Sequence, residues 1–131
     1  MKTRLYVSGD YPTVEKWWAG HKQAAVPANV LPKCGVVVEN NGKPLAAAWL
    51  YQDNSVGVAW LAWLVSNPEA SPFVVAEALE VLFGATERVA RDLQYGLMFT
   101  MTERGSLGRW LQRHGFAPNH RGVTQYFKPL A

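Results

Sequence analysis

Val56-Gly57-Val58-Ala59-Trp60-Leu61-Ala62-Trp63-Leu64-Val65 is the stretch of sequence that decides the fold. Apolar residues occupy both the odd and the even positions of this segment, which is typical of a strand that is buried on both faces in the middle of a sheet. Alternation along the strand predicts that Trp60 and Trp63 lie on opposite faces. The apolar run Leu45–Val65 has the length of a membrane span, but polar residues at 52–55 interrupt it, so we expect two strands and no membrane partner.

The residues before this segment predict a strand, a helix and a hairpin. Leu5–Val7 suits a short first strand, and Thr13 is a candidate N-cap for the helix that follows. Bulky side chains recur there at the i, i+3, i+4 and i+7 spacing of an amphipathic helix, at Val14, Trp17, Trp18 and His21. Asn41-Gly42 is a favoured hairpin turn between the predicted strands Gly35–Glu39 and Pro44–Tyr51.

The residues after it change to a helical period and then return to a strand. A helix is predicted over Pro72–Gln94, with Ser71 as its N-cap and Pro72 in its first turn. Gly96 is expected to end this helix and to open the strand Leu97–Met101. A strand, a long helix and a second strand in this order predict a parallel crossover beside the central strand.

The C-terminal third predicts one more helix and one more strand. Leu107, Trp110, Leu111 and His114 form one helical stripe that Gly115 ends, and Val123–Phe127 suits a closing strand. The element order predicts an α/β (α+β) fold with a mixed central sheet flanked by helices. A chain of 131 residues is expected to form one domain, here residues 1–131.

Composition and charge narrow the function classes. The single cysteine, Cys34, forms no internal disulfide, and no leader-like segment precedes the first strand, so we expect a cytoplasmic protein. His21, His114 and His120 do not have the spacing of metal ligands with each other or with Cys34, so no metal site is predicted. The sequence contains no Gly-x-Ser-x-Gly hydrolase elbow, no P-loop of nucleoside triphosphatases and no His-Glu-x-x-His helix of zinc proteases.

The net charge of +3 comes from residues 86–131. Four arginines in that part could meet the phosphates of a coenzyme or a nucleic acid, or could form a solvated helix face: Arg104, Arg109, Arg113 and Arg121. No RNA-recognition or helix-turn-helix motif accompanies them, so we expect no nucleic-acid partner.

The predicted element order resembles the GCN5-related N-acetyltransferase (GNAT) superfamily, and two segments carry the likeness. Trp110-Leu111-Gln112-Arg113-His114-Gly115-Phe116 resembles the Leu-Tyr-x-Lys-x-Gly-Phe motif of the last helix in that family. Val65-Ser66-Asn67-Pro68-Glu69 resembles the end of the family's fourth strand and the turn that follows it. The short chain also resembles the small phage-encoded members of this fold.

This resemblance implies acetyl-CoA as the cofactor. The family holds the pantetheine arm on its fourth strand, which corresponds to Leu64, Val65 and Ser66. It holds the pyrophosphate on a Gln/Arg-x-x-Gly-x-Gly/Ala loop at a helix N-terminus. That loop corresponds to residues 71–76, where the predicted contacts are Ser71, Phe73, Val74, Val75 and Ala76, and only Ala76 matches the motif. Leu111 occupies the position at which many members have a proton-donating tyrosine.

The resemblance implies an acyl-CoA-dependent N-acyltransferase that moves an acetyl group to an amine acceptor of unknown identity. The alternative is a non-catalytic module of the same fold that binds a protein or nucleic acid through its basic third or an aromatic surface. Polar residues near predicted strand ends are the candidate bases, namely Tyr51, Asp53 and Tyr126. Trp49, Trp60 and Trp63 either pack in the core or line the substrate cleft.

Overall fold

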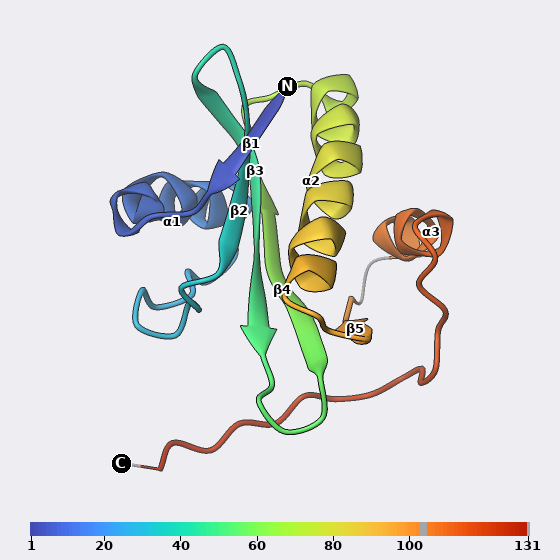
Figure 1. Ribbon diagram of the computed structural model, residues 1–131. Helices are drawn as coiled ribbons and strands as arrows, with labels where there is room; N and C mark the ends of the chain where they lie inside the picture. Colours follow the sequence, from blue (N-terminus) through green and yellow to red (C-terminus); the bar gives the residue numbers. More distant parts are fainter. Residues whose placement is uncertain (103–104, 131) are drawn as a thin grey trace. The chain divides into compact units, whose positions relative to one another are not determined.

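The computed structural model describes residues 1–102 and 105–130 and divides into two compact units, Met1–Met101 and Thr102–Ala131. The first unit holds a five-stranded sheet in the order β1-β2-β3-β4-β5 (Figure 1). Its strands are β1 (Lys2–Leu5), β2 (Gly35–Asn40), β3 (Lys43–Gln52), β4 (Val58–Ser66) and β5 (Leu97–Thr100). Its helices are the short 3-10 helix η1 (Ser8–Asp10), α1 (Tyr11–Gly20) and α2 (Pro72–Asp92).

The sheet is mixed, as the sequence predicts. β1, β2, β3 and β4 pair antiparallel in turn, and β4 pairs with β5 in parallel. The β2–β3 turn has positive φ at Asn41 (52°) and Gly42 (75°), which explains the Asn-Gly sequence there. The predicted hairpin and the predicted crossover from β4 to β5 are therefore confirmed.

The two long helices of the first unit lie on opposite faces of the sheet (Figure 1). α1 packs Val14, Trp17 and Trp18 into a buried cluster that also holds Val37, Ala47, Trp49 and Val65. α2 contacts β3 and β2 and buries Ala78, Leu82, Phe83, Ala85, Thr86 and Ala90. Thr86 is fully buried, and its Oγ1 donates to the Phe83 carbonyl at 3.0 Å, which satisfies the hydroxyl inside the helix.

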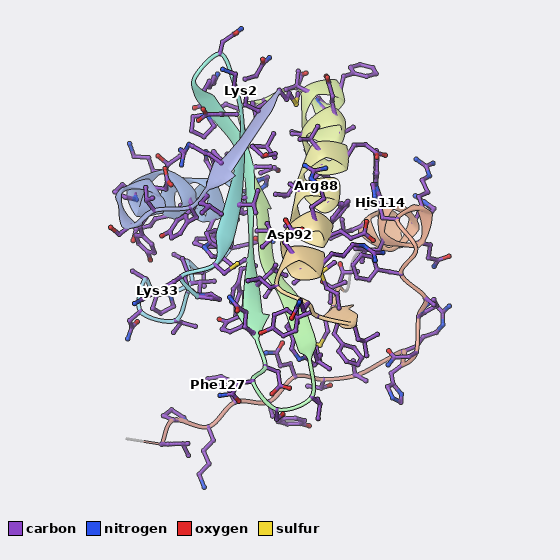
Figure 2. The ribbon with its side chains drawn as sticks, in the orientation of Figure 1. Lys2, Lys33, Arg88, Asp92, His114 and Phe127 are labelled. Atoms are coloured by element: carbon purple, nitrogen blue, oxygen red, sulfur yellow. The ribbon has the colours of Figure 1, made fainter. Side chains whose placement is uncertain are left out.

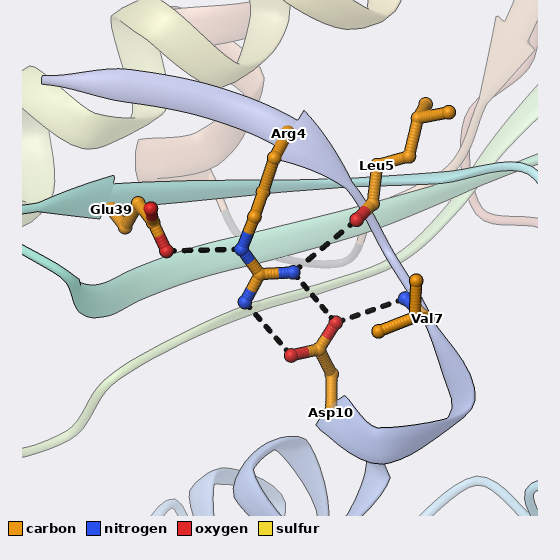
Figure 3. Close-up of polar contacts among 5 residues, drawn as sticks. All are labelled: Arg4, Leu5, Val7, Asp10 and Glu39. Carbon is orange, nitrogen blue, oxygen red and sulfur yellow. Dashed lines mark hydrogen bonds and ion pairs between the residues drawn. The ribbon is translucent and has the colours of Figure 1, made fainter.

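An ion-pair network joins β1, β2 and η1 (Figure 3). The Arg4 guanidinium donates to both carboxylate oxygens of Asp10 at 2.8 Å and to Glu39 Oε2 at 3.0 Å. Asp10 Oδ2 also accepts from the Val7 amide at 2.9 Å. This network and the pairing of Lys2 with Glu39 explain why β1 covers Lys2–Leu5 and why the predicted strand Leu5–Val7 is wrong beyond Leu5.

The structure also corrects the predicted helix ends. α1 begins at Tyr11 with Asp10 at the N-cap position, so Thr13 lies within the helix; Pro12 is favourable in the first turn and allows this earlier start. α2 begins as predicted, with the Ser71 hydroxyl accepting from the Val74 amide. It ends at Asp92 rather than at Gly96, because Gln94 adopts φ of 67° and closes the helix.

The second unit contains α3 (Gly105–Arg113). Gly115 has φ of 86°, and the Phe116 amide donates to the Leu111 carbonyl, so the predicted stop at Gly115 is confirmed. The predicted strand Val123–Phe127 is wrong: these residues form no strand, and Val123, Tyr126 and Phe127 are exposed. β-branched and aromatic residues form a strand only where a neighbouring strand completes the hydrogen-bond ladder. The single domain expected over residues 1–131 stays a prediction.

Candidate functional site

A bulge interrupts β4 at Trp63 and Leu64. Ala47 pairs with Val65 and Trp49 pairs with Ala62, so two residues of β4 lie opposite Ala48 alone. Trp63 has φ of 61°, a left-handed conformation that is rare for a bulky residue. A bulge bends a strand and disturbs the ladder beside it, so this point of β4 is a local departure from regular sheet.

Next to the bulge, β4 loses its second neighbour. β5 pairs with β4 only from Val58 to Leu61, and in the described part of the chain no strand pairs with that edge beyond Leu61. Peptide groups on this edge therefore have no strand partner and can pair with an extended ligand that carries amides, except that the Ser66 carbonyl already accepts from His21. Leu64, Val65 and Ser66 lie here, at the place where the sequence predicts cofactor contacts.

The turn from β4 to α2 is held in place by contacts with α1 and β3. His21, at the end of α1, donates from Nε2 to the Ser66 carbonyl at 2.9 Å. Asn67 is buried, its amide donates to the Leu45 carbonyl, and its Oδ1 accepts from the Glu69 amide. A Cβ on Gly20 would lie 2.6 Å from Pro68 Cγ, so α1 and this turn are in close contact. These contacts fix the position of the turn between the open edge of β4 and the start of α2.

The N-terminus of α2 offers few free amides. Pro72 has no N–H, the Val74 amide donates to Ser71 Oγ at 3.3 Å, and the Val75 amide donates to the Ser71 carbonyl at 2.9 Å. Ala76 lies one position further into the helix. Phe73 therefore contributes the free amide of this turn, and its ring is 89% exposed. An anion here would meet one free amide and the helix dipole.

The three candidate tryptophans fall into two groups. Trp49 is fully buried and packs on Trp18 and Tyr6, so it serves the core. Trp60 and Trp63 are 39% and 38% exposed, which corrects the expectation that β4 is buried on both faces. Trp63 Nε1 donates to Tyr51 Oη at 2.8 Å, and Tyr51 is the register partner of Trp60. The predicted placement of Trp60 and Trp63 on opposite faces is therefore wrong, because the bulge breaks the alternation.

The candidate bases lie in different environments. Tyr51 Oη donates to the Val30 carbonyl at 2.7 Å while accepting from Trp63. The Asp53 carboxylate accepts from the Val56 amide at 2.8 Å and from the Ser55 hydroxyl, and these hydrogen bonds lower the pKa of Asp53. Tyr126 is 87% exposed in the second unit. The structure brings Tyr51 and Trp63 together and places Asp53 two residues further along the same chain segment.

Other chemistry-bearing residues remain outside this site. Burial raises the pKa of the Cys34 thiol, which favours the protonated, unreactive form. Lys33, beside it, lies on the loop between α1 and β2 (Figure 2). No group of three or more possible metal ligands occurs among the described residues. No helix in the described ranges is both long and apolar enough to cross a membrane. Arg104 lies outside the described residues.

Solved structures with a similar fold include acetyltransferases and complexes with CoA. Rv2747 from Mycobacterium tuberculosis, in complex with CoA, matches with a TM-score of 0.71 at 19% identity over 95% of this chain and 76% of that chain. The aminoglycoside N-acetyltransferase AAC(6')-Iy, also in complex with CoA, matches with a TM-score of 0.69 at 16% identity over 98% and 99% of the two chains. An acetyltransferase from Trypanosoma brucei matches with a TM-score of 0.67 at 15% identity over 96% and 99%.

The chain has the GNAT fold. No protein-family model matches the sequence, and no curated protein matches it, so the fold is established by structure alone. In GNAT terms, the bulged β4, its open edge and the N-terminus of α2 occupy the region that the sequence resemblance assigned to the cofactor. The sequence did not indicate the bulge, because Trp63 and Leu64 continue an apolar pattern. It also missed Phe99, which stacks on Trp60 with ring centroids 4.8 Å apart.

Proposed function

We propose that this GNAT-fold chain is an acyl-CoA-dependent N-acyltransferase that moves an acetyl group to an amine. The observation that carries the proposal is the open edge of β4 beyond Leu61, beside a bulge and continuous with the start of α2. An extended arm with amides fits this edge, and a pyrophosphate fits beside the Phe73 amide. The solved CoA complexes of similar fold support the same class of cofactor.

In this reaction the protein mainly positions the two substrates and stabilises charge with its backbone dipoles. When bound, acetyl-CoA supplies an acyl thioester. Backbone N–H groups near Leu64 and Val65 would stabilise the charge that develops on the acyl oxygen. The amine nitrogen forms the new bond to the acyl carbon while the carbon–sulfur bond breaks, and the leaving sulfur takes a proton.

Proton transfer is proposed to run through water. A free amine with a pKa near ~10 is mostly protonated at neutral pH and must lose a proton before it attacks. Asp53 is a weak proton acceptor because its pKa is lowered by hydrogen bonds within its own turn. Leu111 stands where the resembled family often has tyrosine, and a leucine donates no proton. Water is therefore the proposed carrier in both directions.

Calorimetric titration with acetyl-CoA tests this proposal. We expect saturable binding by the full chain and stronger binding by Val74→Gly, because glycine lets the backbone approach the pyrophosphate more closely. Val81→Gly, further along α2, is the matched control, since it lowers helix propensity to a similar extent away from the site. Titration with pantetheine alone separates the open edge from the helix terminus. No saturable binding of acetyl-CoA by the wild type and by Val74→Gly would overturn the proposal.

A further inference from the structure

One end of the sheet face that α1 packs against carries a row of aromatic rings, of which those of Trp60 and Trp63 are exposed and those of Tyr51 and Phe99 are half-buried. Tyr51, Trp60 and Phe99 are register partners across β3, β4 and β5, so their side chains share this face. The rings of Trp60 and Phe99 stack at 4.8 Å with an interplanar angle of 22°. We define Tyr51, Trp60, Trp63 and Phe99 as the aromatic row. α1 covers Trp49 on the same face, whereas Trp60 and Trp63 remain exposed.

The polar groups of two row members are already occupied. Trp63 Nε1 donates to Tyr51 Oη at 2.8 Å, and Tyr51 Oη donates to the Val30 carbonyl at 2.7 Å. These two hydrogen bonds fix the Trp63 and Tyr51 rings and use their donors. The row therefore offers ring faces to a ligand, which favour other aromatic rings and cations.

A carboxylate, that of Asp53, follows the row at the end of β3 where Tyr51 lies. The Asp53 amide donates to the Val58 carbonyl, so Asp53 continues β3 two residues beyond Tyr51 and has the same parity. Its carboxylate accepts from the Val56 amide and from Ser55, which lowers the pKa of Asp53 and keeps it ionised at neutral pH. An ionised carboxylate next to ring faces is complementary to an organic ammonium group.

We propose that the aromatic row binds the acceptor, and that the acceptor is a primary amine that carries an aromatic ring. The assignment rests on the proposed acyltransferase function. The acceptor ring stacks on Trp60 and Phe99, while its ammonium group lies toward Asp53. The row is continuous with the proposed site, because Trp63 is both a row member and the bulge residue of β4.

Binding of two probe amines tests the proposal without any turnover. 2-Phenylethylammonium and 2-cyclohexylethylammonium share charge and approximate size, but only the first has a π system. We expect calorimetry to show saturable binding of the phenyl probe and weaker binding of the cyclohexyl probe. Trp60→Leu should weaken binding of the phenyl probe roughly tenfold, whereas Trp60→Phe, which keeps a ring, should retain most of the affinity.

The control variant is Phe127→Leu, which also replaces an exposed aromatic residue, on the C-terminal segment (Figure 2), and should leave probe binding unchanged. Asp53→Asn should weaken binding of the charged phenyl probe and leave binding of neutral 2-phenylethanol unchanged. Circular dichroism checks that each variant is folded. If Trp60→Leu fails to fold, the comparison of the phenyl and cyclohexyl probes on the wild type and the Asp53→Asn variant still decide the outcome.

The outcomes separate the two proposals. Equal affinity for the phenyl and cyclohexyl probes would overturn the proposal of an aromatic acceptor. Unchanged binding of the phenyl probe by a folded Trp60→Leu variant would do the same. Neither result would contradict binding of acetyl-CoA. Binding of the phenyl probe without any binding of acetyl-CoA overturns the acyltransferase, and with it the acceptor assignment. In a turnover assay, Trp60→Leu should raise KM for 2-phenylethylamine and leave KM for acetyl-CoA unchanged.

Discussion

Gly35 lies against the ring of Trp49 at the start of β2. A Cβ at this position would be 2.6 Å from Trp49 Cδ1 and 2.9 Å from Tyr6 Cβ, closer than real contacts allow. Trp49 is fully buried and stacks on Trp18, so it has no room to move away. Trp49 can therefore pack in this position under α1 only because residue 35 has no side chain.

Gly35→Ala should lower the free energy of unfolding by about 1–3 kcal/mol, because the added methyl group overpacks this contact. Chemical denaturation measures the change. Gly9→Ala is the control, since nothing lies within 4 Å of a Cβ built at Gly9, and it should leave stability nearly unchanged. Equal stability of Gly35→Ala and the wild type would show that the indole of Trp49 can shift.

Asp10 makes the free energy of unfolding depend on pH in the acid range. Hydrogen bonds from Arg4 lower the pKa of Asp10 below its usual value, so the folded state favours the carboxylate. The resulting stability is present above the pKa of Asp10 in the unfolded chain, about 3.9, and is lost as pH falls through the lower folded pKa.

Asp10→Asn should lower the free energy of unfolding at pH 7 by about 0.5–1 kcal/mol, a small amount because Arg4 is partly exposed. The variant should also lose less stability than the wild type between pH 5 and pH 2, roughly the range over which such a carboxylate is protonated. Denaturation curves at several pH values test this. Asp92→Asn, at the exposed C-terminal end of α2 (Figure 2), controls for the loss of a carboxylate. Identical pH profiles of Asp10→Asn and the wild type would contradict the prediction.

At the scale of elements, helix ends show what sequence patterns could and could not predict. α1, α2 and α3 all end with the same pair of hydrogen bonds around a residue of positive φ, at Lys22, Gln94 and Gly115. Only Gly115 is a residue type that marks such an end, so only that end was predicted. The β4 bulge was missed for the same reason, because Trp63 adopts a conformation that its residue type does not indicate.

Gln94→Gly should raise the free energy of unfolding by about 1 kcal/mol, because glycine adopts the left-handed conformation without steric cost. Thermal unfolding should show a higher Tm. Arg88→Gly is the matched control within α2 (Figure 2), where the same replacement should lower stability by about 1 kcal/mol. A lower Tm for Gln94→Gly would mean that the Gln94 side chain makes a stabilising contact.

At the scale of the whole molecule, the order of elements was predictable because periodicity changes clearly along the chain. The hairpin at Asn41-Gly42 and the Ser71-Pro72 helix start carry strong local signals, and both are present. The aromatic row was not predictable, because it depends on register across three strands and on how much of the sheet α1 covers. Long-range packing of this kind leaves no local pattern in the residues involved.

The basic C-terminal third should not make the chain a nucleic-acid binder. The net charge is only +3, and Arg113 stacks on the Trp110 ring at 5.2 Å. We expect negligible retention of duplex or single-stranded DNA at physiological salt in a filter-binding assay, and no change on reversing Arg109 and Arg121. Tight binding that weakens steeply with salt would contradict this, since such a slope reports phosphate neutralisation.

The sheet order β1-β2-β3-β4-β5 follows the order of the chain, and this has a consequence for folding. Closing a short loop costs less entropy than closing a long one, so the β2–β3 hairpin should form early. β5 is separated from β4 by the whole of α2, and until β5 pairs, the outer edge of β4 is a bare strand edge that can pair with other chains. Pulse-labelled hydrogen exchange during refolding should therefore find β2 and β3 amides protected before those of β5.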